Sequence, residues 1–224
     1  MPVGDVMVSY MPGQIPKTVW IFRIIPEQNL PGILQQGILT RNAATHDPNY
    51  VFIGDSQLTA DRHDFSIPLP GYGNLGDYVP FYFGQLSPML LNIKTGYRGI
   101  TKRPQSEIIY LCIKIDSILK AGLRFVFTDG HAKNQFTSFY TSLDDLDKVD
   151  WEVVKSRHWK NTENDYDRQR RKQAEFLVYE QVSPELIDTI VVFNQEKFNF
   201  VEDLVRQYGL NIRVHIDTKG AFYY

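Results

Sequence analysis

Hydrophobic residues in this chain gather in short runs, separated by stretches rich in charged residues, glycine and proline. Runs rich in Ile, Val, Phe and Tyr predict β-strands, whereas a capping residue at the start of a segment and glycine at its end predict a helix. The predicted strands span residues 18–25, 77–83, 108–115, 124–128, 173–179 and 190–193. The predicted helices are short and span residues 29–37, 56–62, 184–188 and 200–208.

The order of these elements indicates the fold class. Strands and helices do not alternate strictly, as they would in a doubly wound parallel sheet, so the pattern favours an α+β fold. The glycine-rich segment 71–76 lacks the flanking strand and helix of a dinucleotide-binding turn, which argues against a Rossmann fold. The long polar region 42–74 is a candidate lid. We expect one domain over residues 17–224, preceded by a loosely attached arm at 1–16 that is rich in proline and glycine.

Composition and charge exclude several classes of protein. The formal net charge is −2, so any binding of nucleic acid must be local rather than driven by a global positive field. The lone cysteine, Cys112, lies in an apolar run and is expected to be a core residue rather than a nucleophile. No metal-ligand spacing, signal-peptide pattern or membrane-length apolar run is found. We therefore expect a cytoplasmic protein that binds neither metal nor membrane.

The most informative local pattern is Gln173 and Glu175 at the entry to an apolar run. Residues two apart on a strand point to one face, so the amide and the carboxylate are expected side by side. A carboxylate there suits the stabilisation of positive charge on a ribose, and the preceding Arg168, Arg170 and Arg171 suit contact with a polyanion. The competing interpretation is a solvated edge strand with a charged entry.

Arg23 is the one charge inside the apolar run 18–25. A guanidinium in that position needs a partner, which is either a structural one or a phosphate or amide of a bound cofactor. After this strand, Asn29 is a predicted cap, Pro31 lies near the first helical position and Gly37 lies just past the end. A helix N-terminus is therefore expected beside the strand, where its N–H groups favour anions and carbonyl oxygens.

Three stretches together carry a family resemblance: residues 22–34, residues 77–84 followed by Ser-Pro-Met at 87–89, and residues 173–178. In this order and at this spacing they closely resemble the DarT family of bacterial DNA ADP-ribosyltransferase toxins. Residues 125–129 and 221–224 also look like that family. The resemblance covers nearly the whole chain from about residue 19 onward.

The resemblance implies a fold similar to the ADP-ribosyltransferase domain, with a split β-sheet cleft and short flanking helices that holds NAD as a substrate. It also implies transfer of ADP-ribose to a base in single-stranded DNA, by a toxin whose partner is a DarG-like macrodomain antitoxin. Thymine is favoured over guanine as the target, because the matching stretches look most like the thymine-modifying members. The alternatives are RNA or protein as acceptor, and an inert nucleic-acid-binding module.

Carried over position by position, the family's catalytic glutamate falls on Glu175 and its catalytic arginine on Arg62. The NAD contacts fall on Arg23, Ile24, Ile25, Gly32, Thr40 and Arg62. The residues expected to bind the DNA strand are Gln173, Arg168, Arg170, Arg171 and Trp159. This chain departs from many members at Arg23, Ile25 and Pro26, so backbone contacts are the safer expectation there.

We expect Glu175 to accept a hydrogen bond from the ribose 2'-hydroxyl and to stabilise an oxocarbenium-like charge. A guanidinium keeps its proton at neutral pH, so Arg62 is expected to orient the base rather than to act as a general base. The polar region 42–64 corresponds to the family's NAD-covering element. Residues 131–175 correspond to its substrate-binding region.

Overall fold

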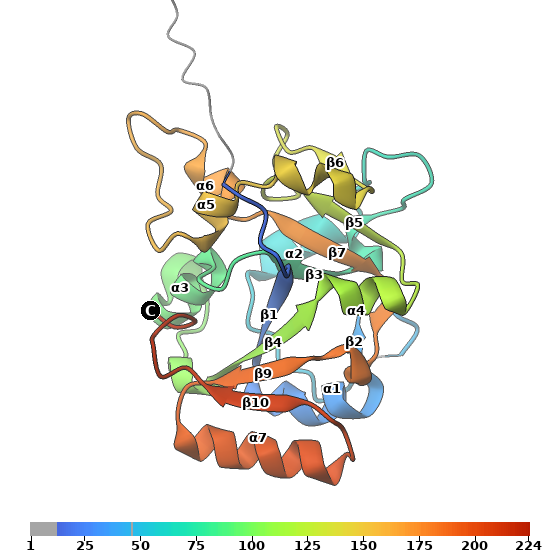
Figure 1. Cartoon of the computed structure of the whole chain (residues 1–224), viewed down its shortest axis with the longest axis vertical. Helices are drawn as coiled ribbons and strands as arrows, with labels where there is room; N and C mark the ends of the chain where they lie inside the picture. The colour runs from blue at the N-terminus through green and yellow to red at the C-terminus, as the bar shows by residue number, and fades with distance from the viewer. Residues whose placement is uncertain (1–12, 46) are drawn as a thin grey trace, which may run out of the picture.

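The computed structural model describes residues 13–45 and 47–224, and in these residues eight strands form one sheet (Figure 1). The order across the sheet is β10-β9-β4-β1-β3-β7-β5-β6. The bounds are β1 Trp20–Pro26, β3 Tyr78–Tyr82, β4 Ile108–Lys114, β5 Phe125–Thr128, β6 Phe139–Tyr140, β7 Glu175–Tyr179, β9 Thr189–Val192 and β10 Arg213–Ile216. Two further strands, β2 Ile38–Leu39 and β8 Gln181–Val182, pair only with each other within the described residues.

The helices are short, apart from the one nearest the end of the chain. Their bounds are α1 Leu30–Gln36, α2 Ser56–His63, α3 Pro88–Thr95, α4 Ile115–Lys120, α5 Trp151–Lys155, α6 Arg168–Arg171 and α7 Gln195–Gln207. Single turns of 3-10 helix lie at Glu27–Asn29, Leu75–Asp77, Tyr97–Gly99, Gln105–Glu107 and Pro184–Leu186, with a longer one at Leu143–Lys148. Residues 1–12 of the predicted arm lie outside the described residues, and the arm stays a prediction.

The sheet is divided between β1 and β3. β1 pairs with β4 along its whole length, from Trp20 opposite Lys114 onward. With β3 it shares a single pair in the described residues, Phe22 opposite Tyr82. Beyond that pair the two halves of the sheet part, with β10-β9-β4-β1 on one side and β3-β7-β5-β6 on the other. The predicted α+β class with a split sheet is confirmed.

β4 lies between β1 and β9, and this position explains its continuous apolar run. Every residue from Ile108 to Ile113 is buried, as expected for a strand covered on both faces. Cys112 is one of these core residues, as predicted. Burial raises the pKa of its thiol, so this thiol stays protonated and unreactive.

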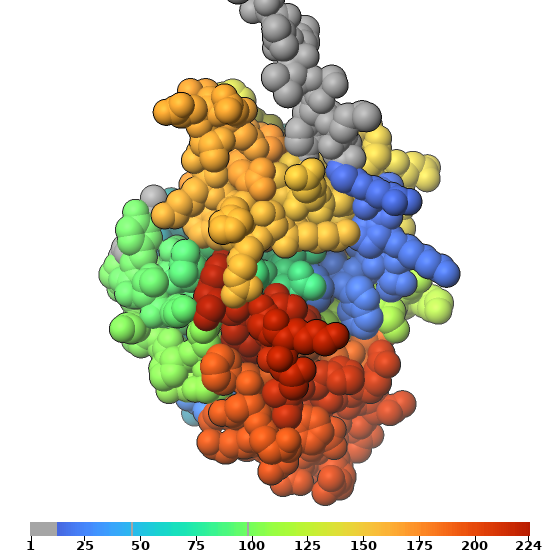
Figure 2. Space-filling view, turned by 60° about the vertical axis from the view of Figure 1, so that its left-hand side comes forward, coloured from blue at the N-terminus to red at the C-terminus, as the bar shows by residue number. Residues whose placement is uncertain are grey.

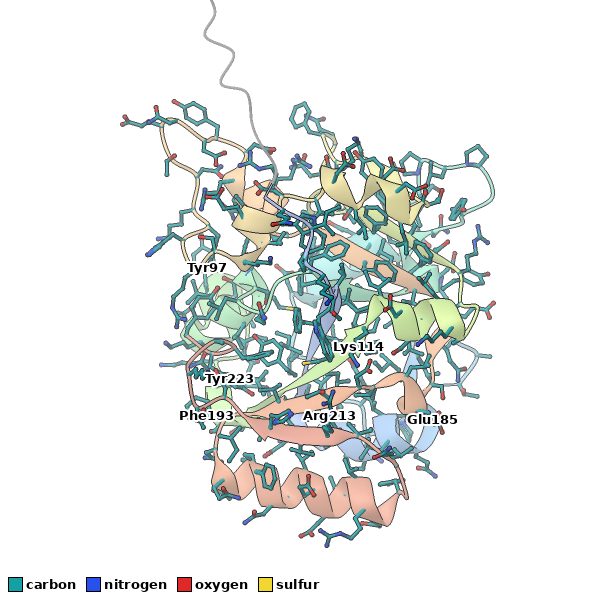
Figure 3. All side chains as sticks on the ribbon, in the orientation of Figure 1. Tyr97, Lys114, Glu185, Phe193, Arg213 and Tyr223 are labelled. Atoms are coloured by element: carbon teal, nitrogen blue, oxygen red, sulfur yellow. The ribbon has the colours of Figure 1, made fainter. Side chains whose placement is uncertain are left out.

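α7 lies along the β10 edge of the sheet (Figure 1). Its Val201 and Val205 are buried in the same cluster as Val214 of β10. The helix begins five residues earlier than the apolar pattern predicted, because the Asn194 side chain caps it by accepting a hydrogen bond from Lys197 N at 3.0 Å. Tyr223 belongs to a different core cluster from Val201 and Val205. Its ring packs edge-on against Phe193, with 5.1 Å between the ring centroids (Figure 3).

Asn29 occupies the N-cap position of α1, as predicted, but it does not cap the helix through its side chain. Its side chain makes no cap, because a 3-10 turn at Glu27–Asn29 already leads the chain into the helix. Instead the buried Asn29 amide donates to Val51 O at 2.9 Å and accepts from Val51 N at 2.7 Å. This two-way bond fastens the polar region 42–74 onto the end of β1.

Candidate active site

Glu175 is the first residue of β7, and its carboxylate is buried, with 3% of the side chain exposed. Arg62 donates from Nη1 to Oε1 at 3.0 Å and from Nη2 to Oε2 at 2.7 Å. Ala132 donates its backbone N–H to Oε1 at 3.0 Å. The Glu175 N–H donates to Thr128 Oγ1 at 3.0 Å and fixes the start of the strand. A carboxylate can be buried this deeply because the hydrogen bonds from Arg62 and Ala132 replace those that it would make to water.

Arg62 reaches Glu175 from the last turn of α2. This helix forms within the polar region because Asp55 caps it, accepting a hydrogen bond from Leu58 N at 3.0 Å. The described residues of α2 include none that is buried, so α2 lacks the apolar packing that stabilises most helices. Its polar side chains must therefore hold it in place.

Two ion pairs fasten α2 across the site. One is Arg62 with Glu175, and the other joins Asp61 to Lys133 at 3.2 Å. Lys133 follows Ala132 directly, so one short segment is hydrogen-bonded to Glu175 and ion-paired with the helix that carries Arg62. The sequence places this segment in the predicted substrate-binding region.

The charges of the central pair reinforce each other. Burial alone raises the pKa of Glu175, but the charge and hydrogen bonds of Arg62 outweigh burial, and the net pKa is lowered. Burial likewise works to lower the pKa of Arg62, while Glu175 raises it above the ordinary value. Both groups are therefore charged at neutral pH, and the Arg62 guanidinium does not give up its proton.

Two uncharged polar side chains lie within electrostatic reach of Glu175. Burial lowers the pKa of His131, helped by repulsion from Arg62 and Lys133, so its imidazole is neutral at pH 7. Burial and the Glu175 charge raise the pKa of Tyr82 to about 12, so its hydroxyl keeps its proton. Tyr82 pairs directly with Glu175 across β3 and β7.

The predicted NAD contacts on β1 divide into side-chain and backbone candidates. Arg23 donates from Nη1 to Pro80 O at 2.9 Å across the split, while its buried Nε has no hydrogen-bond partner among the described residues. Ile24 and Ile25 turn their side chains into the core. Only the backbone of these two residues is available to a ligand.

The two other predicted NAD contacts lie on the elements after β1. Gly32 is in the first turn of α1, where a Cβ would lie 2.4 Å from Asp47 Oδ2, so a larger residue there would displace the Asp47 side chain. Thr40 is buried and donates its N–H to Glu180 O at 3.1 Å. Among the described residues, neither one is hydrogen-bonded to Glu175 or Arg62.

Gln173 does not lie on β7, so the prediction that it shares a strand face with Glu175 is wrong. It occupies the turn after α6, and its Nε2 donates to Gln169 O at 3.0 Å. The chain is helical up to Arg171, and strand geometry begins only at Glu175. The spacing argument failed because α6, with the sequence Arg-Gln-Arg-Arg, has no apolar position that could announce a helix.

Arg170 and Arg171 also differ from the prediction of an open phosphate-binding cluster. Each arginine is paired with two carboxylates. The pairs are Arg170 with Asp167 at 2.7 Å and Asp129 at 2.9 Å, and Arg171 with Asp165 at 2.7 Å and Asp150 at 3.0 Å. Their charges are therefore compensated inside the protein, and both side chains are engaged in structural ion pairs.

We expect Arg170→Gln to lower the free energy of unfolding by about 2 kcal/mol, because it leaves two carboxylates without their partner. The salt dependence of DNA binding should stay as in the wild type. Urea denaturation measures the first quantity and a salt titration of oligonucleotide binding the second. Arg206→Gln, which breaks an ion pair with Asp203 whose side chains are 74% exposed, is the control and should change neither. A stable Arg170→Gln variant with a reduced salt slope would restore the original interpretation.

Lys172, the fourth cation of the run, is buried. Its Nζ donates to Val154 O at 2.7 Å and to Ser156 O at 2.8 Å. Burial, with a smaller contribution from Arg168, lowers the pKa of this amine to about 7, and its uncharged form still has donors for both carbonyls. A Cβ at Gly84 would lie 1.9 Å from Val154 O, so three segments meet here too closely for any residue but glycine.

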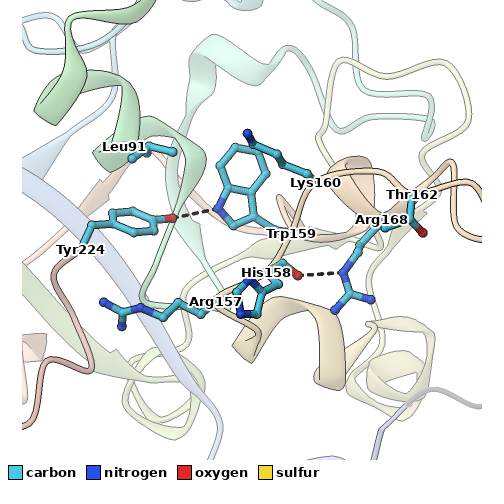
Figure 4. A pocket seen from close by; sticks show the side chains of 8 residues that line it. All are labelled: Leu91, Arg157, His158, Trp159, Lys160, Thr162, Arg168 and Tyr224. Atoms are coloured by element: carbon cyan, nitrogen blue, oxygen red, sulfur yellow. Dashed lines mark hydrogen bonds between the residues drawn. The ribbon is translucent and has the colours of Figure 1, made fainter.

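Arg168 and Trp159 are brought together, and among the described residues neither is hydrogen-bonded or ion-paired to Arg62 or Glu175. Arg168 donates from Nε to His158 O at 2.7 Å. Trp159 is 9% exposed and donates from Nε1 to Tyr224 Oη at 3.0 Å (Figure 4). Both side chains line one cavity.

The Asp61–Lys133 pair is expected to position Arg62. Lys133→Glu should lower turnover about 10-fold, because like charges push α2 away from Glu175. The exchanged double variant Lys133→Glu with Asp61→Lys should recover most of that loss. Initial rates of nicotinamide release measure this, with urea denaturation to show equal folding. Failure of the double variant to recover would show that the pair does not act through its charges.

Several residues of the site were not singled out from the sequence. Ala132 contributes only a backbone N–H, and because nearly every residue type has one, the sequence does not indicate such a donor. Lys133 and Asp61 lie in separate polar regions, so their pairing depends on the fold.

The described part of the chain is residues 13–45 and 47–224. In this part of the chain no helix is both long and apolar enough to cross a membrane. No group of three or more His, Cys, Asp or Glu side chains is arranged there to hold a metal ion.

Comparison with known proteins adds three findings. Residues 22–224 match the family model described as ssDNA thymidine ADP-ribosyltransferase, DarT. A DNA ADP-ribosyl transferase of Escherichia coli O127:H6 is 35% identical over 93% of this chain and 95% of its own length. Two structures of Thermus sp. 2.9 DarT, each 32% identical, are similar in fold. The match to the complex with ADP-ribosylated ssDNA covers 96% of this chain and 100% of the Thermus chain, with a TM-score of 0.86. The match to the complex with NAD+ covers 94% of this chain and 100% of the Thermus chain, with a TM-score of 0.80.

Proposed function

Since the chain belongs to the DarT family of DNA ADP-ribosyltransferases, we propose that it transfers ADP-ribose from NAD to a base in single-stranded DNA. The observation that carries the proposal is the buried Glu175 carboxylate, held by Arg62 beside the point where the sheet halves part. We assign the activity to one domain over residues 17–224. NAD is the sugar donor and is consumed in the reaction.

Glu175 is the residue that we assign to the ribose. A carboxylate oxygen accepts two hydrogen bonds. Oε1 already accepts from Arg62 and Ala132, whereas Oε2 accepts only from Arg62 among the described residues. The remaining position on Oε2 is free for a ribose hydroxyl. As the bond from nicotinamide to C1' breaks, positive charge grows on the sugar, and a fixed carboxylate stabilises it.

Arg62 has two tasks in this proposal. It keeps Glu175 ionised in a buried place, and its remaining N–H groups orient the acceptor base. The base nitrogen forms the new bond to C1', nicotinamide leaves with the electron pair of the broken bond, and the nitrogen releases its proton. A thymine N3 becomes a nucleophile only as that proton leaves, so a nearby guanidinium favours the anion that forms.

Arg23 and the β1 backbone are the residues that we assign to NAD. The buried Nε of Arg23 lacks a hydrogen-bond partner among the described residues, and such a donor suits an anionic or amide oxygen. Ile24 and Ile25 would contribute backbone groups where β1 leaves β3. Gly32 and Thr40 would act from the neighbouring elements.

We favour thymine as the target base because the family model that matches this chain is described by thymidine. Guanine, RNA and protein are the other acceptors to be tested. A base nitrogen used in pairing is hidden in a duplex, so single-stranded DNA is the form expected to react. We also propose the toxin role and a DarG-like macrodomain antitoxin, both supported by the family resemblance.

The decisive experiment incubates the protein with NAD and four short single-stranded DNAs that differ at one base. Mass spectrometry should show the mass of one ADP-ribose added only to the DNA that contains thymine at the test position. Addition to the guanine DNA would move the target to guanine. If no DNA gains mass while nicotinamide is released in the presence of RNA or protein, the DNA assignment fails.

A further inference from the structure

His131 lies on a segment that is fastened to Glu175 at two points. The Glu175 N–H donates to Thr128 Oγ1 at 3.0 Å, and the Ala132 N–H donates to Glu175 Oε1 at 3.0 Å. His131 directly precedes Ala132 in the chain. Its own N–H donates to Arg170 O at 3.0 Å, which fixes its backbone as well. The fold therefore holds this histidine next to the contacts of the central carboxylate.

The imidazole of His131 has no task in holding the fold together. Its backbone carbonyl accepts a hydrogen bond from Thr137 Oγ1 at 2.9 Å, but neither ring nitrogen is hydrogen-bonded or ion-paired to another described residue. The residue is half-buried, so the ring is not closed off from a ligand at the site. A neutral imidazole has one nitrogen with a lone pair that accepts a proton.

The charged groups around this imidazole come from β7, α2, α6 and its own segment. They are Glu175, Arg62, Lys133 and the paired Arg170 and Asp129. Burial is the main cause that lowers the pKa of His131, and the charges of Arg62 and Lys133 lower it further. The Glu175 charge works in the opposite direction but is outweighed. The ring is therefore neutral at pH 7, the form that accepts a proton.

The other groups at this centre are poor proton acceptors at neutral pH. The pKa of Glu175 is lowered, so its carboxylate is a weak base. Arg62 already holds its proton, because Glu175 raises its pKa. Tyr82 has a pKa of about 12 and keeps its hydroxyl proton. Among the described side chains that act electrostatically on Glu175, His131 is thus the one neutral nitrogen base.

We propose that His131 is the catalytic base that accepts the N3 proton of thymine. The inference rests on the proposed function and supplies the proton acceptor that the reaction needs. The N3–H bond breaks, N3 forms the new bond to C1', and nicotinamide leaves with the electron pair of the old bond. The proton stays on the imidazole and passes to water after the product leaves. The Glu175 charge, which acts on the ring, stabilises the imidazolium that forms.

The test replaces His131 by glutamine in the full chain, because glutamine is polar but does not take up a proton. Transfer to a thymine DNA at pH 7 should fall about 100-fold, within the usual contribution of a general base. The Kd of NAD, measured by calorimetry, should not change. Urea denaturation should show an unchanged free energy of unfolding, because the ring makes no hydrogen bond within the described residues.

His215→Gln is the matched control. His215 is exposed on β10, and β10 and β6 lie at opposite edges of the sheet. Figure 2 shows α7 and the C-terminal residues, in orange-red and red, below the yellow and light orange segments that follow β5 in the chain. This variant should transfer ADP-ribose like the wild type.

Two further measurements separate proton transfer from a structural role. A target 5-bromouracil is close to thymine in size, but its N3 proton is more acidic, so the loss in His131→Gln should shrink from about 100-fold to about 10-fold. Raising the pH from about 7 to about 9 should also reduce the loss on thymine, because hydroxide then ionises N3 without the enzyme. Wild-type transfer should fall in acid, since His131 below its lowered pKa is protonated and accepts no proton.

Transfer to thymine close to the wild type at pH 7 would overturn the assignment. An equal loss on thymine and 5-bromouracil at every pH would also overturn it, because a residue that only holds the site in shape is insensitive to the acidity of N3. A weaker Kd of NAD would overturn it in favour of a contact with the dinucleotide. If the wild type modifies no thymine DNA, the proposed function itself fails, and that result is distinct because it appears before any variant is compared.

Discussion

Replacing Glu175 by glutamine is expected to reduce ADP-ribose transfer by about 100- to 1,000-fold. The amide has nearly the same size but no charge, so it no longer stabilises positive charge on the ribose. The variant should also lose about 3 kcal/mol of unfolding free energy, because the buried guanidinium of Arg62 loses its counter-charge. Nicotinamide release and the mass of the modified DNA measure activity, and urea denaturation measures stability.

A second variant separates catalysis from folding. Glu175→Asp keeps the charge and most of the stability but withdraws the carboxylate by one methylene, so transfer should still fall roughly 100-fold. Glu152→Gln, an exposed carboxylate on α5, is the control and should behave like the wild type. Near-normal transfer by both Glu175 variants would remove the carboxylate from the mechanism.

Arg62→Lys tests geometry at constant charge. Lysine is a point charge and cannot form the two parallel bonds of 3.0 Å and 2.7 Å that arginine makes to Glu175. We expect transfer to fall about 100-fold, while the unfolding free energy falls by only about 1 kcal/mol because an ion pair persists. The same assays apply, and Arg41→Lys, an exposed arginine in the neighbouring polar region, is the control.

The two outcomes of Arg62→Lys point to different roles. A large loss of transfer with normal NAD binding would support orientation of the base. Transfer close to the wild type would mean that positive charge alone is sufficient, which contradicts the assigned role.

Strands were the most predictable part of the fold. The apolar runs became β1, β3, β4, β5, β7 and β9 with ends shifted by no more than two residues, because a buried strand needs apolar residues in sequence order. β10 and α6 were not predicted. β10 has the sequence Arg-Val-His-Ile and α6 has four polar residues, so both depend on tertiary contacts rather than on their own pattern.

From the sequence, site residues could be predicted only where the residue type itself indicates a chemical role. Glu175 was singled out by the local pattern and by the family resemblance, and Arg62 by the resemblance alone; the fold brings them together although 113 residues separate them. Arg170 and Arg171 each have one partner near in sequence, Asp167 and Asp165, but their second partners, Asp129 and Asp150, are distant, so the full extent of their pairing could not be predicted. Charge pairing across the chain is a property of the fold, and local composition does not contain it.

Burial of Cys112 has a practical consequence for observing α2. The chain has one cysteine, and its thiol lies inside β4 with a raised pKa, so maleimide reagents should not reach it in the native protein. A cysteine introduced at Leu58, which is 37% exposed on α2, would thus be the sole labelling position. A fluorophore placed there would report movement of this helix during turnover without any change to the native thiol.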